Sequence, residues 1–147
     1  MRSFVIGAAF TGVLGVGLAV AQDSPIKQRQ AIMESNGKAM QLVTKMAKGE
    51  TPYDAKAAAD AMKSIHDGAP KFVTLFPVGT EKGEKTRAKP AIWQNKKDFD
   101  DWAKQLQEDT SKAQTAAAGG LDSFKTAMAA IGKTCSGCHD DYREKKD

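Results

Sequence analysis

The stretch Cys135-Ser136-Gly137-Cys138-His139, near the end of this 147-residue chain, carries the strongest indication of its fold and chemistry. Two thiols three positions apart, followed directly by an imidazole, form the attachment signature of a c-type haem. On a helix the three side chains share one face. The thiols can then form thioethers with one porphyrin while His139 reaches its iron as an axial ligand. The pentad therefore predicts one covalently bound haem c.

Three other interpretations of the pentad are a structural disulfide, a thioredoxin-like redox pair and half of a zinc site. A zinc site needs four ligands, and the chain has only these two cysteines and one other histidine, His66, in a polar segment typical of a surface histidine. A redox pair is expected just after a strand in a βαβ unit, and nothing before Cys135 has the pattern of a strand. Haem attachment is the favoured interpretation.

Residues 1–21 have the pattern of a cleaved signal peptide. A positive start at Met1-Arg2-Ser3 precedes an uncharged apolar stretch from Phe4 to Leu18, and Ala19-Val20-Ala21 is a small-x-small cleavage site. An uncleaved membrane anchor is the alternative, because the apolar run approaches the length that spans a bilayer. We expect removal of the signal, which leaves residues 22–147 as one periplasmic domain without a stable membrane span.

Charge is nearly balanced, with 22 basic and 18 acidic residues and a formal net charge of +4. Lysines cluster between positions 82 and 97 and again at 145 and 146. No aromatic residues are interleaved with them at stacking distance, so the sequence gives little support for nucleic acid binding. A solvated surface is the simpler interpretation of the lysines, and docking to an acidic redox partner is the alternative.

The first half of the domain has the pattern of two helices. Ser24 and Pro25 form an N-cap and N1 pair, and apolar residues then recur at spacings of three and four until the helix ends near Gly49. The stretch Thr51-Pro52-Tyr53-Asp54 repeats the start signal, with Asp54 placed to reach back from N3. An alanine-rich helix follows and runs towards Phe72.

The second half contains one long connection and two more helices. Residues from about Phe76 to Pro90 have no apolar period and form the connection. Asn95-Lys96-Lys97-Asp98 has the spacing of an acidic capping box and opens a helix that Gly119-Gly120 stops. From Leu121 an apolar stripe leads directly into the pentad. Four helices without a strand predict an all-α fold, an antiparallel four-helix bundle whose site lies between facing helices.

This arrangement resembles the class II cytochromes c, the cytochrome c′ family. The resemblance covers essentially the whole chain after the signal. Its most specific element is the position of the pentad on the last helix, because most other c-type cytochromes carry it near the N-terminus. The resemblance implies an up-down-up-down topology with the haem held by the C-terminal helix.

The resemblance also implies roles for residues of the first helix. The family's Arg-Gln dipeptide, usually close to a haem propionate, falls on Arg29 and Gln30, and the distal position falls on Met33. The surrounding sequence is similar to the low-spin branch, in which the distal methionine ligates iron. In the high-spin branch the sixth position is empty. Beyond His139, Arg143 matches a His-Asp-x-Tyr-Arg run near the proximal pocket, and a solvated helix end is its alternative.

Several of these residues also have ordinary structural interpretations. Met33 lies on an apolar stripe, where a methionine is more often core filler than a ligand. Aromatic side chains on a bundle face are core by default, although they could pack on a porphyrin. These expectations apply to two sets, the methionines Met40, Met46, Met62 and Met128 and the aromatic residues Trp93, Phe99 and Trp102.

Two function classes follow from these alternatives. A haem with both axial positions filled carries one electron by Fe(III)/Fe(II) cycling, exchanges it with redox partner proteins and binds no substrate. An open distal face instead binds nitric oxide or carbon monoxide. We do not expect an enzyme, because the first helix supplies Arg29 but no histidine as a distal acid or base. The resemblance also permits a homodimer through the first two helices.

Overall fold

The computed structural model describes residues 23–145, so the predicted signal peptide lies outside the described residues. Its elements are the helices α1 (Pro25–Ala47), α2 (Ala55–Val73), α3 (Ala91–Gln94), α4 (Lys96–Ala117) and α5 (Leu121–Tyr142). The described part of the chain contains no strand, and its one β-bridge pairs Ala88 with Arg143. The predicted all-α fold is confirmed. No helix within residues 23–145 is both long and apolar enough to cross a membrane.

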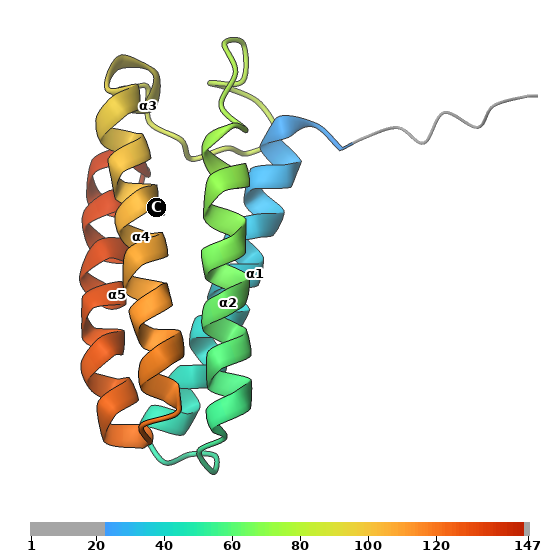
Figure 1. The fold of residues 1–147 in the computed structure, drawn as a ribbon. Helices are drawn as coiled ribbons and strands as arrows, with labels where there is room; N and C mark the ends of the chain where they lie inside the picture. The colour runs from blue at the N-terminus through green and yellow to red at the C-terminus, as the bar shows by residue number, and fades with distance from the viewer. Residues whose placement is uncertain (1–22, 146–147) are drawn as a thin grey trace, which may run out of the picture.

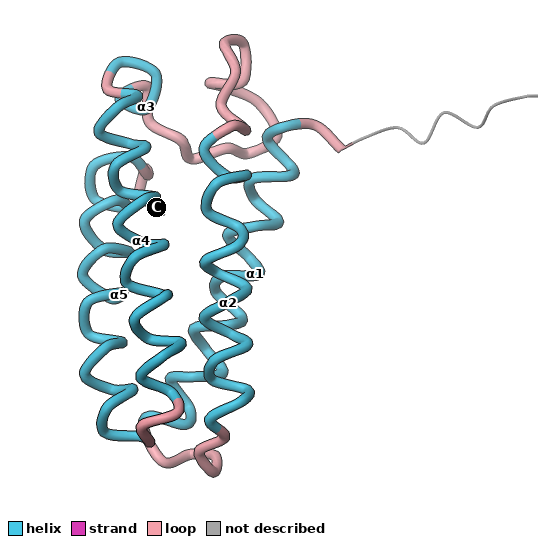
Figure 2. The backbone as a smooth tube through the Cα atoms, in the orientation of Figure 1, coloured by secondary structure: helices cyan, strands magenta, loops and turns pink. Residues whose placement is uncertain are grey.

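The four long helices form an antiparallel bundle (Figure 1). Extensive contacts join α2 to α4, α4 to α5 and α1 to α2. Figure 2 shows that the α1–α2 and α4–α5 connections lie at one end of the bundle, and that the long connection before α3 lies at the other. The up-down-up-down topology implied by the sequence resemblance is therefore present.

Local capping explains where α1 begins and ends. The Ser24 hydroxyl accepts a hydrogen bond from the Lys27 amide at 3.2 Å, and Pro25 occupies the first turn, where its missing N–H costs nothing. After the last turn Gly49 adopts a φ of +75°, the left-handed conformation that glycine reaches without strain. Both ends agree with the sequence prediction.

The start of α2 differs from the prediction. Asp54 is the N-cap and not the N3 residue, because its carboxylate accepts from the Ala57 amide at 2.9 Å and the helix begins at Ala55. Thr51 and Pro52 belong to the preceding connection. An aspartate fits both positions chemically, so the local sequence alone did not separate them.

The expected capping box at the start of α4 is also wrong. The Asn95 side chain makes no capping hydrogen bond, and the sequence analysis missed the short α3, which leads almost directly into α4. Asp98 instead accepts a hydrogen bond from the Tyr142 hydroxyl at 2.6 Å. This bond joins α4 to the end of α5, and a partner 44 residues away cannot be inferred from local spacing.

Two apolar clusters hold the bundle together. The larger contains Met46 and Met62 as the core filler that was expected, with Met40 and Met128 packed against it. Its other buried members come from all four long helices and are Val43, Ala58, Ala61, Ile65, Ala113, Ala117, Phe124 and Ile131. The smaller cluster, near the long connection, contains Phe76, Ile92, Phe99 and Tyr142. Its rings meet edge to face, for example Phe76 and Phe99 at 4.8 Å between centroids.

Arg29 fixes the long connection to α1. Although charged, it is only 4% exposed. Its two terminal nitrogens donate four hydrogen bonds of 2.7–3.0 Å, to the carbonyl oxygens of Leu75 and Thr80 and to the hydroxyls of Thr80 and Thr86. The guanidinium carbon also lies 4.5 Å from the centroid of the Phe76 ring. Burial lowers the pKa of Arg29, but a guanidinium so well bonded stays charged.

Replacing Arg29 with methionine should lower the free energy of unfolding by about 3 kcal/mol, because buried acceptors of the connection lose their donors. Lys27→Met, at an exposed position of the same helix, is the matched control and should change stability by less than about 0.5 kcal/mol. Urea denaturation followed by circular dichroism measures both. Equal stability of the two variants would contradict this role of Arg29.

Candidate haem-binding site

A cavity of about 530 Å³ opens between α1 and the α4–α5 pair, close to the long connection. Its volume lies in the range of small-molecule and cofactor pockets. All seven residues that the sequence analysis assigned to the site line it, and they are Arg29, Gln30, Met33, Cys135, Cys138, His139 and Arg143. The first helix, α1, and the last helix, α5, thus contribute to one pocket, as expected for a bundle site built from facing helices.

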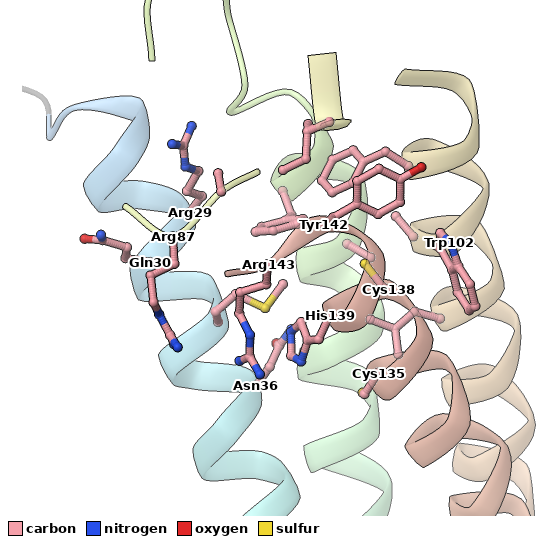
Figure 3. A pocket seen from close by; sticks show the side chains of 18 of the residues that line it. Arg29, Gln30, Asn36, Arg87, Trp102, Cys135, Cys138, His139, Tyr142 and Arg143 are labelled. Atoms are coloured by element: carbon pink, nitrogen blue, oxygen red, sulfur yellow. The ribbon is translucent and has the colours of Figure 1, made fainter. Parts of the chain in front are cut away.

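The pentad places both thiols and the imidazole on the cavity face of α5 (Figure 3). The two cysteines are half-buried and form no disulfide. Burial raises the pKa of both thiols, to about 11 for Cys138. Burial and the nearby Arg143 and Arg87 lower the pKa of His139, which favours the neutral imidazole that binds metals. This donor set fits a porphyrin attached through two thioethers with one axial histidine.

Much of the remaining cavity wall is apolar, which suits the flat hydrophobic face of a porphyrin. Phe72, Phe76, Ile92, Phe99 and Leu106 line it from α2, α3, α4 and the start of the long connection. Of the three aromatic residues weighed from sequence, Phe99 and Trp102 line the cavity. Trp93 is not among the lining residues and packs edge to face on Phe76, with its centroid 5.7 Å away.

Gly137, inside the pentad, lets α5 approach α4 closely. A Cβ added there would lie 3.0 Å from Cζ2 and Cζ3 of Trp102, and closer still to Cη2. Such distances are shorter than carbon–carbon van der Waals contact, so no larger residue fits without displacing the indole. Trp102 in turn forms part of the wall behind Cys135 and Cys138 (Figure 3). The glycine thus allows the close approach of α5 to α4.

On α1, Met33 and Met40 both line the cavity, two helical turns apart. Their surroundings differ. Met40 packs against the larger apolar cluster, whereas Met33 belongs to neither cluster among residues 23–145. Met33 is half-buried, and core packing therefore does not account for its position. Asn36 lies on the same helix face, close to Arg143 and His139 in Figure 3.

The sequence analysis missed a buried polar contact beside Cys135. Thr134 donates to Asp109 at 2.7 Å, and Gln105 donates to the other oxygen of that carboxylate at 2.9 Å. Asp109 and Thr134 are 5% and 6% exposed. A signal was available, because Asp109 falls on the apolar stripe of α4 between Leu106 and Ala113. The contact fixes the register of α5 against α4 next to Cys135.

His66 agrees with its sequence interpretation. It lies on α2 outside the cavity lining, with its side chain about one-third exposed and its Nδ1 3.1 Å from an Asp67 oxygen.

The fold and the cavity together define a four-helix-bundle haem protein. The family model for cytochrome c′ matches residues 24–143, so the chain belongs to the cytochrome c′ family. Covalently bound haem c is the cofactor of this family and of this chain, and its members function in electron transport.

Relatives named cytochrome c′ and cytochrome c-556 align over most of the chain. Over 137 residues it is 39% identical to a cytochrome c′ of Rhodopseudomonas palustris, with 91% of each protein covered. It is 32% identical to a cytochrome c-556 of the same organism, with 99% of each covered. The solved cytochrome c′ of R. palustris superposes with a TM-score of 0.79 at 33% identity, covering 86% of this chain and all of the other.

A further solved relative has a bound gas. It is a carbon monoxide-bound variant of cytochrome c′ from Alcaligenes xylosoxidans, with a TM-score of 0.73 at 30% identity, which covers 82% of this chain and 94% of that protein.

Replacing Gly137 with alanine should destabilise the protein by about 1–3 kcal/mol, because the new methyl group overlaps the Trp102 ring. Gly132→Ala, one and a half turns earlier on α5, is the matched control. Nothing lies within 4 Å of a Cβ at that position, so the control should gain about 0.5–1 kcal/mol from helix propensity. Thermal unfolding of the two holoproteins tests this, and an unchanged or raised melting temperature for Gly137→Ala would contradict it.

Proposed function

We propose that this protein is a periplasmic electron carrier whose haem c is attached through Cys135 and Cys138 and ligated by His139 and Met33. The observation that carries the proposal is the position of Met33 and His139. Met33 lies on α1 and His139 on α5, the first and last helices of the bundle, and both line the same cavity. Of the two methionines that line the cavity, Met33 is the one that the apolar clusters leave unused.

The residues suit this role chemically. A thioether is a soft ligand for haem iron, and Met/His ligation raises the reduction potential into a range useful for electron transfer. When bound, the haem supplies the one-electron Fe(III)/Fe(II) couple. The chain holds both proposed ligands on long helices and surrounds them with apolar side chains that exclude water. Little rearrangement of the protein then accompanies a change of charge at the site.

Binding of a diatomic gas is the second candidate. The carbon monoxide-bound relative from A. xylosoxidans supports it, since that protein has the same fold at 30% identity. In this function Met33 would only obstruct the sixth position, and carbon monoxide or nitric oxide would bind there. The two candidate functions differ in whether the Met33 thioether coordinates the haem iron.

We do not propose an enzymatic activity. A haem enzyme needs a distal acid or base next to an open coordination site. Among the described residues that line the cavity there is no carboxylate and no histidine besides His139. Arg29 on α1 already donates four hydrogen bonds to the long connection. The proposed partners are redox proteins, and an α1–α2 homodimer is compatible with the 42% exposed Leu42 on α1.

An absorption spectrum of the purified holoprotein separates the two candidates. The electron carrier should show narrow low-spin bands in the reduced form and no change when carbon monoxide is added. A high-spin spectrum that shifts with carbon monoxide would replace the electron-carrier proposal with gas binding.

Met33→Ala should convert the haem to a high-spin form that binds carbon monoxide, because the thioether is lost and a small cavity remains above the iron. Met40→Ala is the matched control on the same helix. Both changes should cost about 2–5 kcal/mol of stability as large-to-small substitutions, but only the first should change the spin state. A low-spin spectrum in Met33→Ala would show that another residue is the ligand.

Cys138→Ala should leave a single thioether, so the haem should remain attached through Cys135 alone. The double variant that lacks both thiols should release its haem into acidified acetone, whereas the wild type retains it. Intact-protein mass spectrometry measures covalent retention in each case. A wild-type protein that loses its haem on extraction would refute attachment at the pentad.

A further inference from the structure

Arg87 and Arg143 place two guanidinium groups at the edge of the cavity. Neither side chain makes a hydrogen bond or an ion pair to any residue between 23 and 145. Both line the cavity, and both lower the pKa of His139 through their charge. In Figure 3 the guanidinium of Arg143 lies beside the imidazole, and that of Arg87 points in the same direction from the long connection.

The backbone holds these two arginines next to each other. Ala88 and Arg143 form the β-bridge, the Glu144 amide donates to the Arg87 carbonyl at 2.8 Å, and the Lys89 amide donates to the Tyr142 carbonyl at 3.0 Å. The long connection is therefore fastened to the end of α5 directly beside Arg87. The positions of the two charges follow from this pairing and not from any contact between their side chains.

Several other cations of the described chain have an acidic or carbonyl partner within the protein. Five lysines on the helices form i,i+4 ion pairs, namely Lys38–Glu34, Lys56–Asp60, Lys63–Asp67, Lys96–Asp100 and Lys97–Asp101. The guanidinium of Arg29 donates four hydrogen bonds to the long connection. Two neighbouring like charges without partners repel each other, and a bound anion removes that cost. The pair thus has the chemistry of an anion site.

The surroundings indicate which anion fits. Arg87, His139 and Arg143 line both the apolar cavity and a smaller, more polar hollow of about 390 Å³ outside it. Lys85 adds a further cation to the cavity wall, whereas Asp140, Glu144 and Lys145 line only the outer hollow. A ligand with an apolar body inside and carboxylates at its edge matches this division.

We infer that Arg87, together with Arg143, binds the propionate carboxylates of the haem at the mouth of the cavity. Arg29, to which the family resemblance gave that contact, acts as a positioning residue that holds the connection carrying Arg87. The inference rests on haem attachment at the pentad, which the proposed function shares with its gas-binding alternative. It does not depend on whether Met33 ligates the iron.

The test is the reduction potential of the holoprotein as a function of pH, with Arg87→Gln compared with Lys82→Gln. Lys82 is exposed on the same connection, does not line the cavity and carries the same charge. A guanidinium partner keeps a carboxylate ionised to lower pH, and an ionised carboxylate favours Fe(III). The reduction potential falls as the pH rises through the pKa of the carboxylate. In Arg87→Gln this fall should therefore occur at a pH that is higher by about 1–3 units. The wild type and Lys82→Gln should show the same dependence of the potential on pH. Arg87→Lys should shift the curve most of the way back to that of the wild type.

Two outcomes would overturn the inference. Superposable curves for Arg87→Gln and Lys82→Gln would show that Arg87 contacts no haem carboxylate. A wild-type curve that shifts on addition of inorganic phosphate, as far as the Arg87→Gln curve shifts, would show that the pair binds free anions. Both readouts are obtained from a low-spin or a high-spin haem, so they are independent of the spin-state test of the proposed function.

Discussion

The hydrogen bonds of Arg29 are the interaction on which the cavity depends. The long connection buries Leu75 and Phe76 at its start, but Val78 beyond them is 90% exposed, so burial alone holds little of the connection against the bundle. The buried guanidinium of Arg29 holds the following residues, because it donates to two carbonyls and two hydroxyls while it lies against the Phe76 ring. Once the connection is held, Arg87 and the cavity edge have fixed positions.

The bundle also divides its packing so that a cavity can exist. The larger apolar cluster draws on all four long helices, and the aromatic cluster joins α3, α4, the end of α5 and the start of the long connection. The cavity takes the place of extensive direct contact between α1 and α5. Asp109 and Gly137 fix α5 against α4 at that height, through a buried hydrogen bond and a close ring contact. The protein's own contacts therefore position the wall that carries the pentad.

The sequence predicted what local chemistry and periodicity determine. Ser24 and Gly49 mark the ends of α1, and the stripe from Leu121 carries α5 into the pentad. It did not predict features set by distant partners. Asp98 bonds to Tyr142 and not to its own helix end, and the partners of Arg29 lie 46 to 57 residues away. Arg87 has no local motif at all, since only the bridge beside it brings it to the cavity.

The long connection has a consequence for the order of folding. It is bonded to the first turns of α1 through Arg29 and to the last turn of α5 through the bridge at Ala88, so both of its fastenings join segments far apart in the chain. Contacts between distant segments form late, because the loop entropy of closing them must first be offset. The helix with Cys135 and Cys138 can therefore form while the mouth of the cavity is still open. We expect both thiols to be accessible during that interval, before the long connection closes the mouth of the cavity.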